Sequence, residues 1–473
     1  MAQFFQNYGE KIAALDEYGN KITYDEMFHI MEEIKTVTKS RTLVFSLCTN
    51  TIGSLLGYFC FLNSRIVPLL VSGSLDDKLL NSLIETYQPS YLWIPEEKKS
   101  MFRECSQIYS AYGYVLLQTN CSPYPMYEEL GLLLTTSGST GSPKLVKQSY
   151  KNIESNTKSI VEYLKLTDEE RPITTLPMNY TYGLSVINTH LYVGATILLT
   201  EKTLMQKDFW TFFEQEKATS LAGVPYTYEI LNKLRIFRMD LPSLTTMTQA
   251  GGKLSPELHK KFAEYALETG RKFIVMYGQT EATARMAYLP AEKSLEKYGS
   301  MGIAIPGGTF ELIDINGDII NTHNVVGELI YTGDNVTLGY AQKGDDLIIG
   351  DERNGRLATG DMALMDEDGY YYIVGRKKRF LKIFGNRVNL DEIEQLICSK
   401  FQSIECVCGG KDDRLMIYIV KNECSDAELD NVKKYISLKT GLNPSAFKTA
   451  FISEIPKSDS GKTLYNKLEE YVI

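Results

Sequence analysis

The chain has 473 residues, of which 44% are hydrophobic and 23% are charged, and its formal net charge is -9. This length exceeds one ordinary hydrophobic core and predicts two or three domains, and the composition is that of a globular protein without long disordered segments. The negative charge, with no basic stripe that carries interleaved aromatic residues, argues against a nucleic-acid-binding protein.

Strands and helices alternate through the first part of the chain. Residues 96–130 are polar and predict little regular structure. The alternation before them predicts right-handed crossovers and a parallel sheet. The expected elements are a hairpin and an amphipathic helix over 12–36, strands over 42–47, 65–71 and 91–94, and helices over 51–62 and 74–86, the last capped by Ser74.

A second round of the same doubly wound pattern follows a loop rich in glycine and serine. Its expected helices cover 150–164, 183–193, 208–216 and 226–234, and its strands cover 174–177, 195–199 and 220–223. Strands then dominate, at 310–315, 327–331 and 370–373. The last hundred residues predict a separate α+β unit with helices over 390–399 and 426–440 and strands over 404–408 and 415–420.

The loop from Thr135 to Lys144 is the first motif that carries chemistry. It follows three leucines at 132–134 and consists almost wholly of glycine and hydroxyl residues. Gly138 and Gly141 allow backbone N–H groups to gather around one anion, and Lys144 adds a positive charge. This inventory suits a polyphosphate, although the spacing is not that of a Walker A loop. Taken alone, the run fits a flexible surface loop equally well.

Three further motifs favour the phosphate interpretation. Met-Tyr-Gly-Gln-Thr-Glu-Ala-Thr at 276–283 follows an apolar strand, and it offers an aromatic ring for a purine and a carboxylate for Mg²⁺. Asp361 precedes Arg376 by fifteen residues, and together they suit the vicinal hydroxyls of a ribose. A polar loop at 456–463 contains Lys462 in Ser-Gly-Lys-Thr, but Pro456 stands where a P-loop requires glycine.

In this order, and over residues 20–467, the four motifs resemble those of the adenylate-forming superfamily of acyl-CoA synthetases, luciferases and carrier-loading adenylation domains. The resemblance implies an α/β fold: an N-terminal domain (1–374) of two doubly wound subdomains plus a small β-barrel, a hinge (375–380) and a mobile α+β C-terminal domain (381–473). It also implies an enzyme that uses ATP and Mg²⁺ to convert a carboxylic acid to an acyl-adenylate, with release of pyrophosphate. A thiol, from coenzyme A or from the phosphopantetheine of a separate acyl carrier protein, would then accept the acyl group.

The same resemblance assigns roles to individual residues. Thr280 would contact the α-phosphate, Glu281 would hold Mg²⁺, and Lys462 would be the catalytic lysine of the first step. The nucleotide would also contact the loop residues Thr136, Ser137, Gly138, Ser139, Thr140, Gly141 and Lys144, and Gly251, Gly252, Tyr277, Gly278, Asp361 and Arg376. Lys378 would be the hinge residue, and Lys382 and Gly385 would serve the second step.

Departures from the family pattern bear on the acid. Tyr180 stands where many acyl- and aryl-CoA ligases place histidine, and Gly183 stands where amino-acid adenylation domains place an aspartate. Glycine cannot pair with an ammonium group, so an α-amino acid is disfavoured. The expected pocket suits a fatty, hydroxylated or aryl acid, although its tyrosines would serve equally well as core residues; it comprises Tyr180, Tyr182, Gly183, Val224, Pro225 and Tyr226.

Three alternative functions remain open from the sequence: an amino-acid-adenylating or carrier-loading enzyme, an amide-forming ligase and a non-catalytic nucleotide-binding relative. The eight cysteines and four histidines lack metal-ligand spacing, which predicts free thiols in a reducing compartment. Polar residues interrupt the N-terminal segment, and the most apolar stretch, 52–71, is broken at 63–65, so we expect neither a signal peptide nor a transmembrane segment. A cytoplasmic protein is therefore expected.

Overall fold

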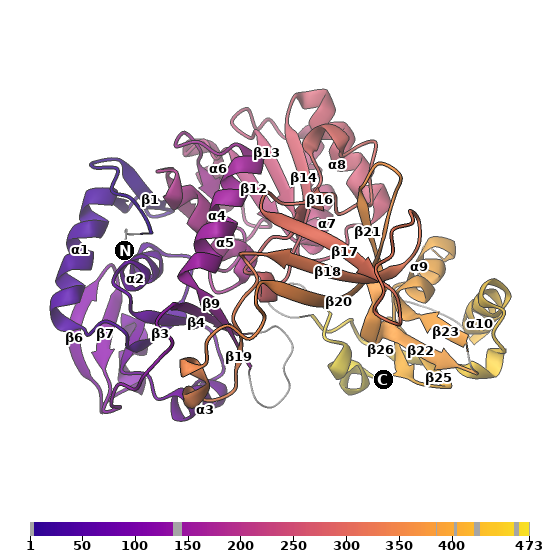
Figure 1. The fold of residues 1–473 in the computed structure, drawn as a ribbon. Helices are drawn as coiled ribbons and strands as arrows, with labels where there is room; N and C mark the ends of the chain where they lie inside the picture. The colour runs from indigo at the N-terminus through magenta and orange to yellow at the C-terminus, as the bar shows by residue number, and fades with distance from the viewer. Residues whose placement is uncertain are drawn as a thin grey trace. The chain divides into compact units, whose positions relative to one another are not determined.

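The computed structural model describes residues 4–135, 144–384, 386–401, 404–420, 426–457 and 463–472. The chain forms two compact units. The first comprises Met1–Thr309 and Tyr331–Leu357, and the second comprises Phe310–Ile330 and Ala358–Ile473. Figure 1 follows the chain through these units from indigo to yellow.

The predicted hairpin and helix over 12–36 are present. Strands β1 (Ile12–Asp16) and β2 (Lys21–Thr23) pair antiparallel, and α1 (Tyr24–Val37) begins directly after them. The Thr23 hydroxyl accepts a hydrogen bond from the Glu26 N–H and so caps the helix.

An eight-stranded sheet contains the strand that precedes the Gly/Ser loop. Its order is β19-β9-β8-β4-β3-β5-β7-β6. The predicted parallel pairing is confirmed for β3 (Leu43–Cys48), β4 (Val67–Ser72), β5 (Tyr91–Pro95) and β8 (Leu130–Thr135). Helices α2 (Ile52–Asn63) and α3 (Asp77–Tyr87) lie between these strands in the sequence. At the edges, β6 (Ser106–Ala111), β7 (Tyr114–Gln118), β9 (Leu145–Ser149) and β19 (Gly339–Ala341) pair antiparallel.

Two predictions for this sheet are wrong. Asp76, and not Ser74, caps α3, because its carboxylate accepts hydrogen bonds from the N–H groups of Lys78 and Leu79. Residues 96–130 contain the hairpin β6–β7. Strand β7 is buried on both faces from Tyr114 to Leu117 and therefore lacks the alternation that marks a half-buried strand.

A nine-stranded sheet carries the second round of the pattern, in the order β16-β15-β14-β13-β12-β10-β11-β1-β2. Its strands are β10 (Pro172–Ile173), β11 (Ile197–Leu199), β12 (Ser220–Gly223), β13 (Thr246–Gln249), β14 (Lys272–Tyr277), β15 (Ala287–Tyr288) and β16 (Ile303–Ala304). The helices are α4 (Tyr150–Leu164), α5 (Thr181–Tyr192), α6 (Lys207–Gln215), α7 (Pro225–Lys233) and α8 (Pro256–Thr269). Helices α4 and α5 lie side by side (Figure 1). The sequence places the end of a strand at 174–177, whereas β10 already ends at Ile173.

A four-stranded sheet follows, in the order β17-β18-β20-β21, where the resemblance implies a small barrel. Its strands are β17 (Gly308–Ile313), β18 (Gly327–Gly333), β20 (Arg356–Met365) and β21 (Tyr371–Arg376). The sequence did not predict β20, whose residues carry the Asp361 motif.

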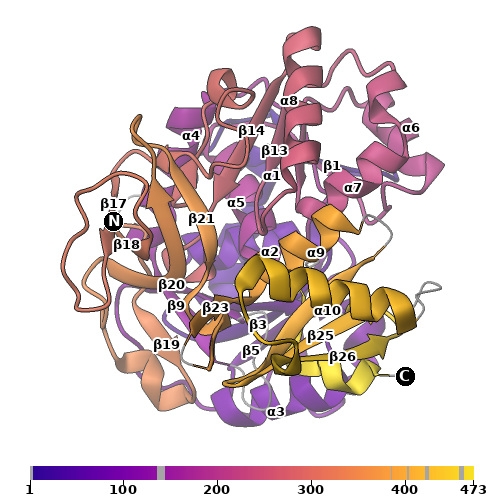
Figure 2. The same ribbon diagram turned by 90° about the vertical axis from the view of Figure 1, so that its right-hand side faces the viewer.

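The C-terminal part is the predicted α+β unit. It contains the hairpin β22 (Phe380–Ile383)–β23 (Asn386–Asn389), α9 (Leu390–Lys400) and the sheet of β24 (Cys406–Lys411), β25 (Arg414–Val420) and β26 (Phe447–Ile452). Helix α10 (Asp426–Thr440) connects the parallel strands β25 and β26 (Figure 2), and its buried Val432 and Ile436 join the core beneath it. The α/β fold class predicted from the sequence is confirmed.

Candidate active site

The second motif forms a tight loop at the carboxyl end of β14. Strand β14 ends at Tyr277, and a 3₁₀ turn, η3 (Thr280–Ala282), follows. A Cβ on Gly278 would lie 1.7 Å from the Ala284 carbonyl oxygen, so only glycine permits the chain to fold back here. The half-buried Tyr277 accepts a hydrogen bond at its hydroxyl from Gln279 Nε2 (3.2 Å).

Glu281 is held at both its backbone and its side chain. Its carbonyl oxygen accepts hydrogen bonds from Thr337 N (3.0 Å), Thr337 Oγ1 (2.9 Å) and Arg353 Nη1 (3.0 Å). Its carboxylate Oε1 accepts from the Tyr340 hydroxyl at 2.7 Å. Burial, followed by the charge of Glu281, raises the pKa of Tyr340 to about 12, so this phenol stays protonated and donates.

Two cations flank the Tyr340 ring. Lys144 Nζ lies 5.5 Å and Arg353 Cζ lies 4.7 Å from its centroid. The last residue of the Gly/Ser loop is thus close to the tyrosine that binds Glu281, so the structure brings the first and second motifs together. The other loop residues predicted for phosphate, Thr136 to Gly141, lie outside the described residues.

The donor set around Glu281 fits a magnesium ion. Within the described ranges, no lysine or arginine forms an ion pair with the Glu281 carboxylate, and no cluster of three or more His, Cys, Asp or Glu side chains could hold a metal by itself. Mg²⁺ commonly binds through one or two carboxylates and the phosphates of a nucleotide, and this carboxylate suits that mode.

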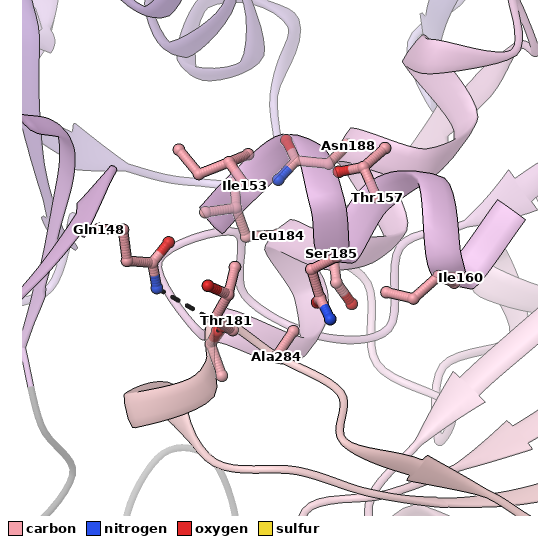
Figure 3. Close-up of a pocket in the computed structure, with 11 residues that line it drawn as sticks. Gln148, Ile153, Thr157, Ile160, Thr181, Leu184, Ser185, Asn188 and Ala284 are labelled. Atoms are coloured by element: carbon pink, nitrogen blue, oxygen red, sulfur yellow. Dashed lines mark hydrogen bonds between the residues drawn. The ribbon is translucent and has the colours of Figure 1, made fainter. Parts of the chain in front are cut away.

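A strained turn follows Glu281. Thr283 has φ 63° and ψ -62°, and the Ala284 N–H donates to the Ala282 carbonyl (2.7 Å), which makes a classic-type γ-turn that β-branched residues rarely adopt. The Thr283 carbonyl accepts hydrogen bonds from Thr181 Oγ1 and from Gln148 Nε2, and these three residues line a small pocket. Figure 3 labels Gln148 and Thr181 among the residues around this pocket. The rest of the fold thus imposes this conformation, as is common near functional sites.

The predicted acid pocket is partly assembled. Gly251 has φ +84°, and a Cβ there would lie 2.5 Å from the Tyr180 hydroxyl and 3.1 Å from Val224 Cγ1. A Cβ on Gly252 would lie 3.1 Å from Pro225 Cγ. The two glycines after β13 therefore allow the backbone to contact three of the predicted pocket residues.

The remaining pocket candidates differ in their surroundings. The hydroxyl of the buried Tyr182 lies 2.8 Å from the Thr248 carbonyl oxygen, to which it donates. Tyr226 is 47% exposed. A Cβ on Gly183 would lie 2.3 Å from the Pro177 carbonyl oxygen, so the packing of α5 against the preceding loop excludes any side chain at this position.

Sequence reasoning missed Arg285, Tyr340 and Arg353. Arg285 is only 3% exposed, and its guanidinium lies 3.7 Å from the centroid of the Tyr182 ring. The sequence did contain one indication of Arg285, because a charged residue is unusual within the apolar segment Ala284-Arg285-Met286-Ala287. Tyr340 and Arg353 lie 59 and 72 residues from Glu281 and belong to no recognisable motif, so no local pattern could have identified them.

In the second unit, the predicted ribose pair is assembled by a β-hairpin. Asp361 in β20 is the direct cross-strand partner of Arg376 in β21, and Arg376 Nε lies 3.2 Å from Asp361 Oδ1. The Asp361 side chain is 5% exposed and that of Arg376 is 61% exposed, so the pair presents its cation to solvent.

The basic segment after Arg376 is not one solvated face. Arg379 is buried, and it binds Asp391 (2.6 Å), Glu394 (2.5 Å) and the Cys408 carbonyl (2.9 Å) while its guanidinium lies 3.9 Å from the Tyr465 ring centroid. The side chains of Lys378 and Lys382, and all of Gly385 and Lys462, lie outside the described residues.

The ends of the fourth motif are nevertheless close together. Lys457 and Thr463 pair as an antiparallel bridge, and the Leu464 N–H donates to the Pro456 carbonyl (2.8 Å). Among the residues that the structure describes, no helix is both long and apolar enough to cross a lipid bilayer.

Comparisons with known proteins identify the family of the chain and relatives of its fold. Residues 75–341, more than half of the chain, match the model of a family described as AMP-binding enzyme. The peroxisomal OPC-8:0-CoA ligase 1 of Arabidopsis thaliana is 28% identical over 353 residues, which cover 72% of this chain and 64% of that protein. The long-chain-fatty-acid–CoA ligase of Yersinia pestis is 28% identical over 368 residues, which cover 72% and 61%. The aligned part is thus less than two thirds of either relative.

Solved structures resemble the fold over nearly the whole chain. The o-succinylbenzoate CoA synthetase of Bacillus subtilis, in complex with its acyl-adenylate intermediate, superimposes with a TM-score of 0.79 at 21% identity, and the match covers 97% of this chain and 95% of that one. Another structure of that synthetase holds ATP and a magnesium ion, with a TM-score of 0.76.

Proposed function

Because the chain belongs to the AMP-binding enzyme family, we propose that it activates a carboxylic acid with ATP, releases pyrophosphate and transfers the acyl group from the adenylate to coenzyme A. The observation that carries this proposal is the convergence of the first two motifs on Tyr340, which donates to Glu281 and lies between Lys144 and Arg353. Transfer to a separate acyl carrier protein through its phosphopantetheine is the second possibility for the acceptor.

The first step needs charge neutralisation more than covalent chemistry. A carboxylate attacks the α-phosphorus in line with the departing pyrophosphate, and negative charge develops at both ends. Lys144 and Arg353 supply positive charge on the pyrophosphate side, and Thr280 donates to the α-phosphate. Glu281 would hold Mg²⁺, which would supply further positive charge to the phosphates. Tyr340 keeps the Glu281 carboxylate oriented by its hydrogen bond.

The adenine and the ribose of the nucleotide are proposed to bind at the two remaining groups of predicted residues. Tyr277, with Gly278 beside it, would stack on adenine, and Gly251 and Gly252 would line the cleft between adenine and the acid. The Asp361 carboxylate would accept hydrogen bonds from the ribose hydroxyls, and its cross-strand pairing with Arg376 supports that role.

The second step is proposed to use a domain rotation. Residues 375–380 would form the hinge between domains 1–374 and 381–473, with Lys378 as the turning residue. Rotation would withdraw Lys462 and bring Lys382 and Gly385 to the thiol. The buried ion pairs of Arg379 support this arrangement, because they fasten the hinge segment to α9 and so give the C-terminal part a rigid base.

The geometry at Gly183 supports an acid other than an α-amino acid. The Pro177 carbonyl occupies the space of any side chain there, so no carboxylate at this position can pair with an α-ammonium group. The acid is therefore proposed to bind among Tyr180, Tyr182 and Val224 without a carboxylate that pairs with an ammonium group.

A cytoplasmic location stays a prediction from cysteine usage.

Replacing Lys462 tests the proposed chemistry. Lys462→Ala should reduce acid-dependent ATP–pyrophosphate exchange by about 10²–10³-fold, by analogy with loss of one oxyanion donor, and should largely spare thioester formation from supplied acyl-adenylate. Equal loss in both assays would contradict the assigned role.

The wild-type protein separates the alternatives. The absence of exchange with any acid would favour a non-catalytic nucleotide-binding relative. Consumption of acid with an amine, but without a thiol, would favour an amide-forming ligase.

A further inference from the structure

Arg285 is a buried cation without a carboxylate partner. Its side chain stacks on Tyr182, its Nε has no hydrogen-bond partner, and no aspartate or glutamate within the described ranges forms an ion pair with it. The Tyr163 phenol is within hydrogen-bonding reach, but it is neutral. Burial raises the pKa of Tyr163, Tyr180 and Tyr182, and the Arg285 charge opposes this rise at all three, so its field extends across the tyrosine cluster.

The chain treats its other deeply buried cations differently. Lys147 Nζ pairs with Glu352 (3.1 Å) and with two carbonyl groups. Arg379 pairs with Asp391 and Glu394. A buried charge is costly unless it is paired, and a cation–π contact offsets only part of that cost. The missing partner of Arg285 therefore requires an explanation.

The backbone around Arg285 is firmly held. Its N–H donates to Asn156 Oδ1 (3.3 Å), and its carbonyl accepts from Asn156 Nδ2 and Asn335 Nδ2, each at 2.9 Å. The strained turn at Thr283 lies two residues before it. The fold thus fixes the position of an arginine that it does not neutralise, which is the arrangement of a preorganised binding group.

Arg285 adjoins the proposed acid pocket. Tyr182, on which it stacks, packs in one apolar cluster with Val224 and Ala250, and Tyr180 packs against the same cluster. Tyr180 in turn lies over Gly251. The unpaired guanidinium therefore borders the residues proposed to surround the acyl group.

We propose that Arg285 binds a second carboxylate of the substrate, so that the acid activated here is a dicarboxylic acid. This inference rests on the proposed function and narrows its substrate class. A guanidinium presents a planar fork of N–H donors that matches a carboxylate, and a charge-assisted pair of this kind is among the strongest hydrogen-bonding arrangements. The substrate would supply the negative charge that the protein omits, while its other carboxylate attacks ATP.

The test compares each acid with its own ester. Straight-chain dicarboxylic acids from malonate to suberate and their monomethyl esters would be assayed by ATP–pyrophosphate exchange with the wild type, Arg285→Met and Arg285→Lys. For the chain length that the wild type activates fastest, kcat/KM should be at least about 100-fold higher for the diacid than for its monomethyl ester. The ester leaves the buried Arg285 charge without a partner, and such a loss typically has this size or more. Arg285→Met should abolish or invert that preference, and Arg285→Lys should retain part of it.

Arg271→Met is the matched control. Arg271 also stacks on a tyrosine, at 5.1 Å from the Tyr265 centroid, and it donates to the carbonyls of Leu241 and Leu244. Its replacement should leave the ratio of diacid to ester unchanged, although it removes a stacked arginine.

Several outcomes would overturn the proposal. A wild type that activates monoesters or monocarboxylic acids as well as diacids would leave the proposed function standing and refute the role of Arg285. Exchange with no acid at all would refute the proposed function itself and this inference with it. Thermal unfolding of the ligand-free protein gives a second readout: Arg285→Met should be at least as stable as the wild type. If Arg285→Met had a clearly lower Tm and lost exchange activity equally with the diacid and with its monomethyl ester, Arg285 would have a structural role.

Discussion

Two buried arginines, Arg285 in the first unit and Arg379 in the second, both contact a tyrosine ring but differ in their carboxylate partners. Arg285 is 3% exposed and Arg379 is 8% exposed, and each lies over a tyrosine ring, at 3.7 and 3.9 Å respectively. Arg379 has two carboxylates and a carbonyl within hydrogen-bond distance. Arg285 has no carboxylate partner within the described ranges. Equal burial therefore does not imply an equal role.

The energetics of buried charge explain why the partners matter. Removing one member of a buried ion pair leaves the other charged and desolvated, which typically costs about 3–5 kcal/mol. Removing an unpaired buried charge relieves a desolvation penalty instead. A cation–π contact contributes about 2 kcal/mol or more when desolvated, which offsets only part of the cost of burying a charge. We therefore expect the network around Arg379 to contribute to the stability of the fold, and we expect Arg285 to reduce stability in the absence of a ligand.

The largest effect is expected at Arg379. Arg379→Met should lower the free energy of unfolding by about 3–5 kcal/mol, because it leaves the half-buried carboxylates of Asp391 and Glu394 without their cation. Denaturant titration of the full chain measures it, with Arg414→Met, at an exposed position of β25, as the control expected to change little. A loss at Arg379 no greater than that of the control would remove the structural half of the comparison.

A smaller effect concerns pH. Burial raises the pKa of Glu394 above its ordinary value, although Arg379 opposes that rise. A carboxyl whose pKa is raised on folding favours the folded state at low pH, and that contribution is lost as pH rises through the folded-state pKa. In Arg379→Met the pKa of Glu394 should rise further, so the destabilisation should grow by about 1–2 kcal/mol between pH 5 and pH 8.

Denaturant titrations across this range would show the trend, and adding Glu394→Gln to Arg379→Met should flatten it. A destabilisation that is independent of pH would mean that Glu394 is not the carboxyl that Arg379 neutralises.

The sequence predicted features whose cause is local. The spacing of Asp361 and Arg376 suggested a pair, and the β20–β21 hairpin makes them cross-strand neighbours. Helix α4 was predicted over its full length, and the structure shows a local cap at its start, where the Ser149 hydroxyl accepts a hydrogen bond from the Asn152 N–H. The resemblance to the family drew attention to Gly278, and the structure gives a local reason for this glycine, because a Cβ there would lie 1.7 Å from the Ala284 carbonyl oxygen.

Features that depend on long-range packing were not predictable. Tyr340 lies 59 residues after Glu281 in the sequence, and their hydrogen bond depends on how β19 joins the edge of the eight-stranded sheet. The same limit applies to the arginines. Arg379 lies in a run of basic residues, a pattern that is typical of a solvated surface. Arg285 lies in an apolar stretch of the sequence. Only the folded structure shows that Arg379, and not Arg285, has carboxylates beside it.

The smallest effect tests whether carboxylates or the aromatic ring hold Arg379 in place. Tyr465 is 39% exposed, so its ring contributes a partly solvated cation–π contact, and Tyr465→Leu should cost only about 0.5–1 kcal/mol in the free energy of unfolding. Denaturant titration beside Arg379→Met gives the ratio of the two losses directly. If Tyr465→Leu were as costly as Arg379→Met, stacking alone would suffice to stabilise a buried arginine. The stacking on Tyr182 would then account for Arg285 without any anionic ligand, and the contrast between the two arginines would lose its functional meaning.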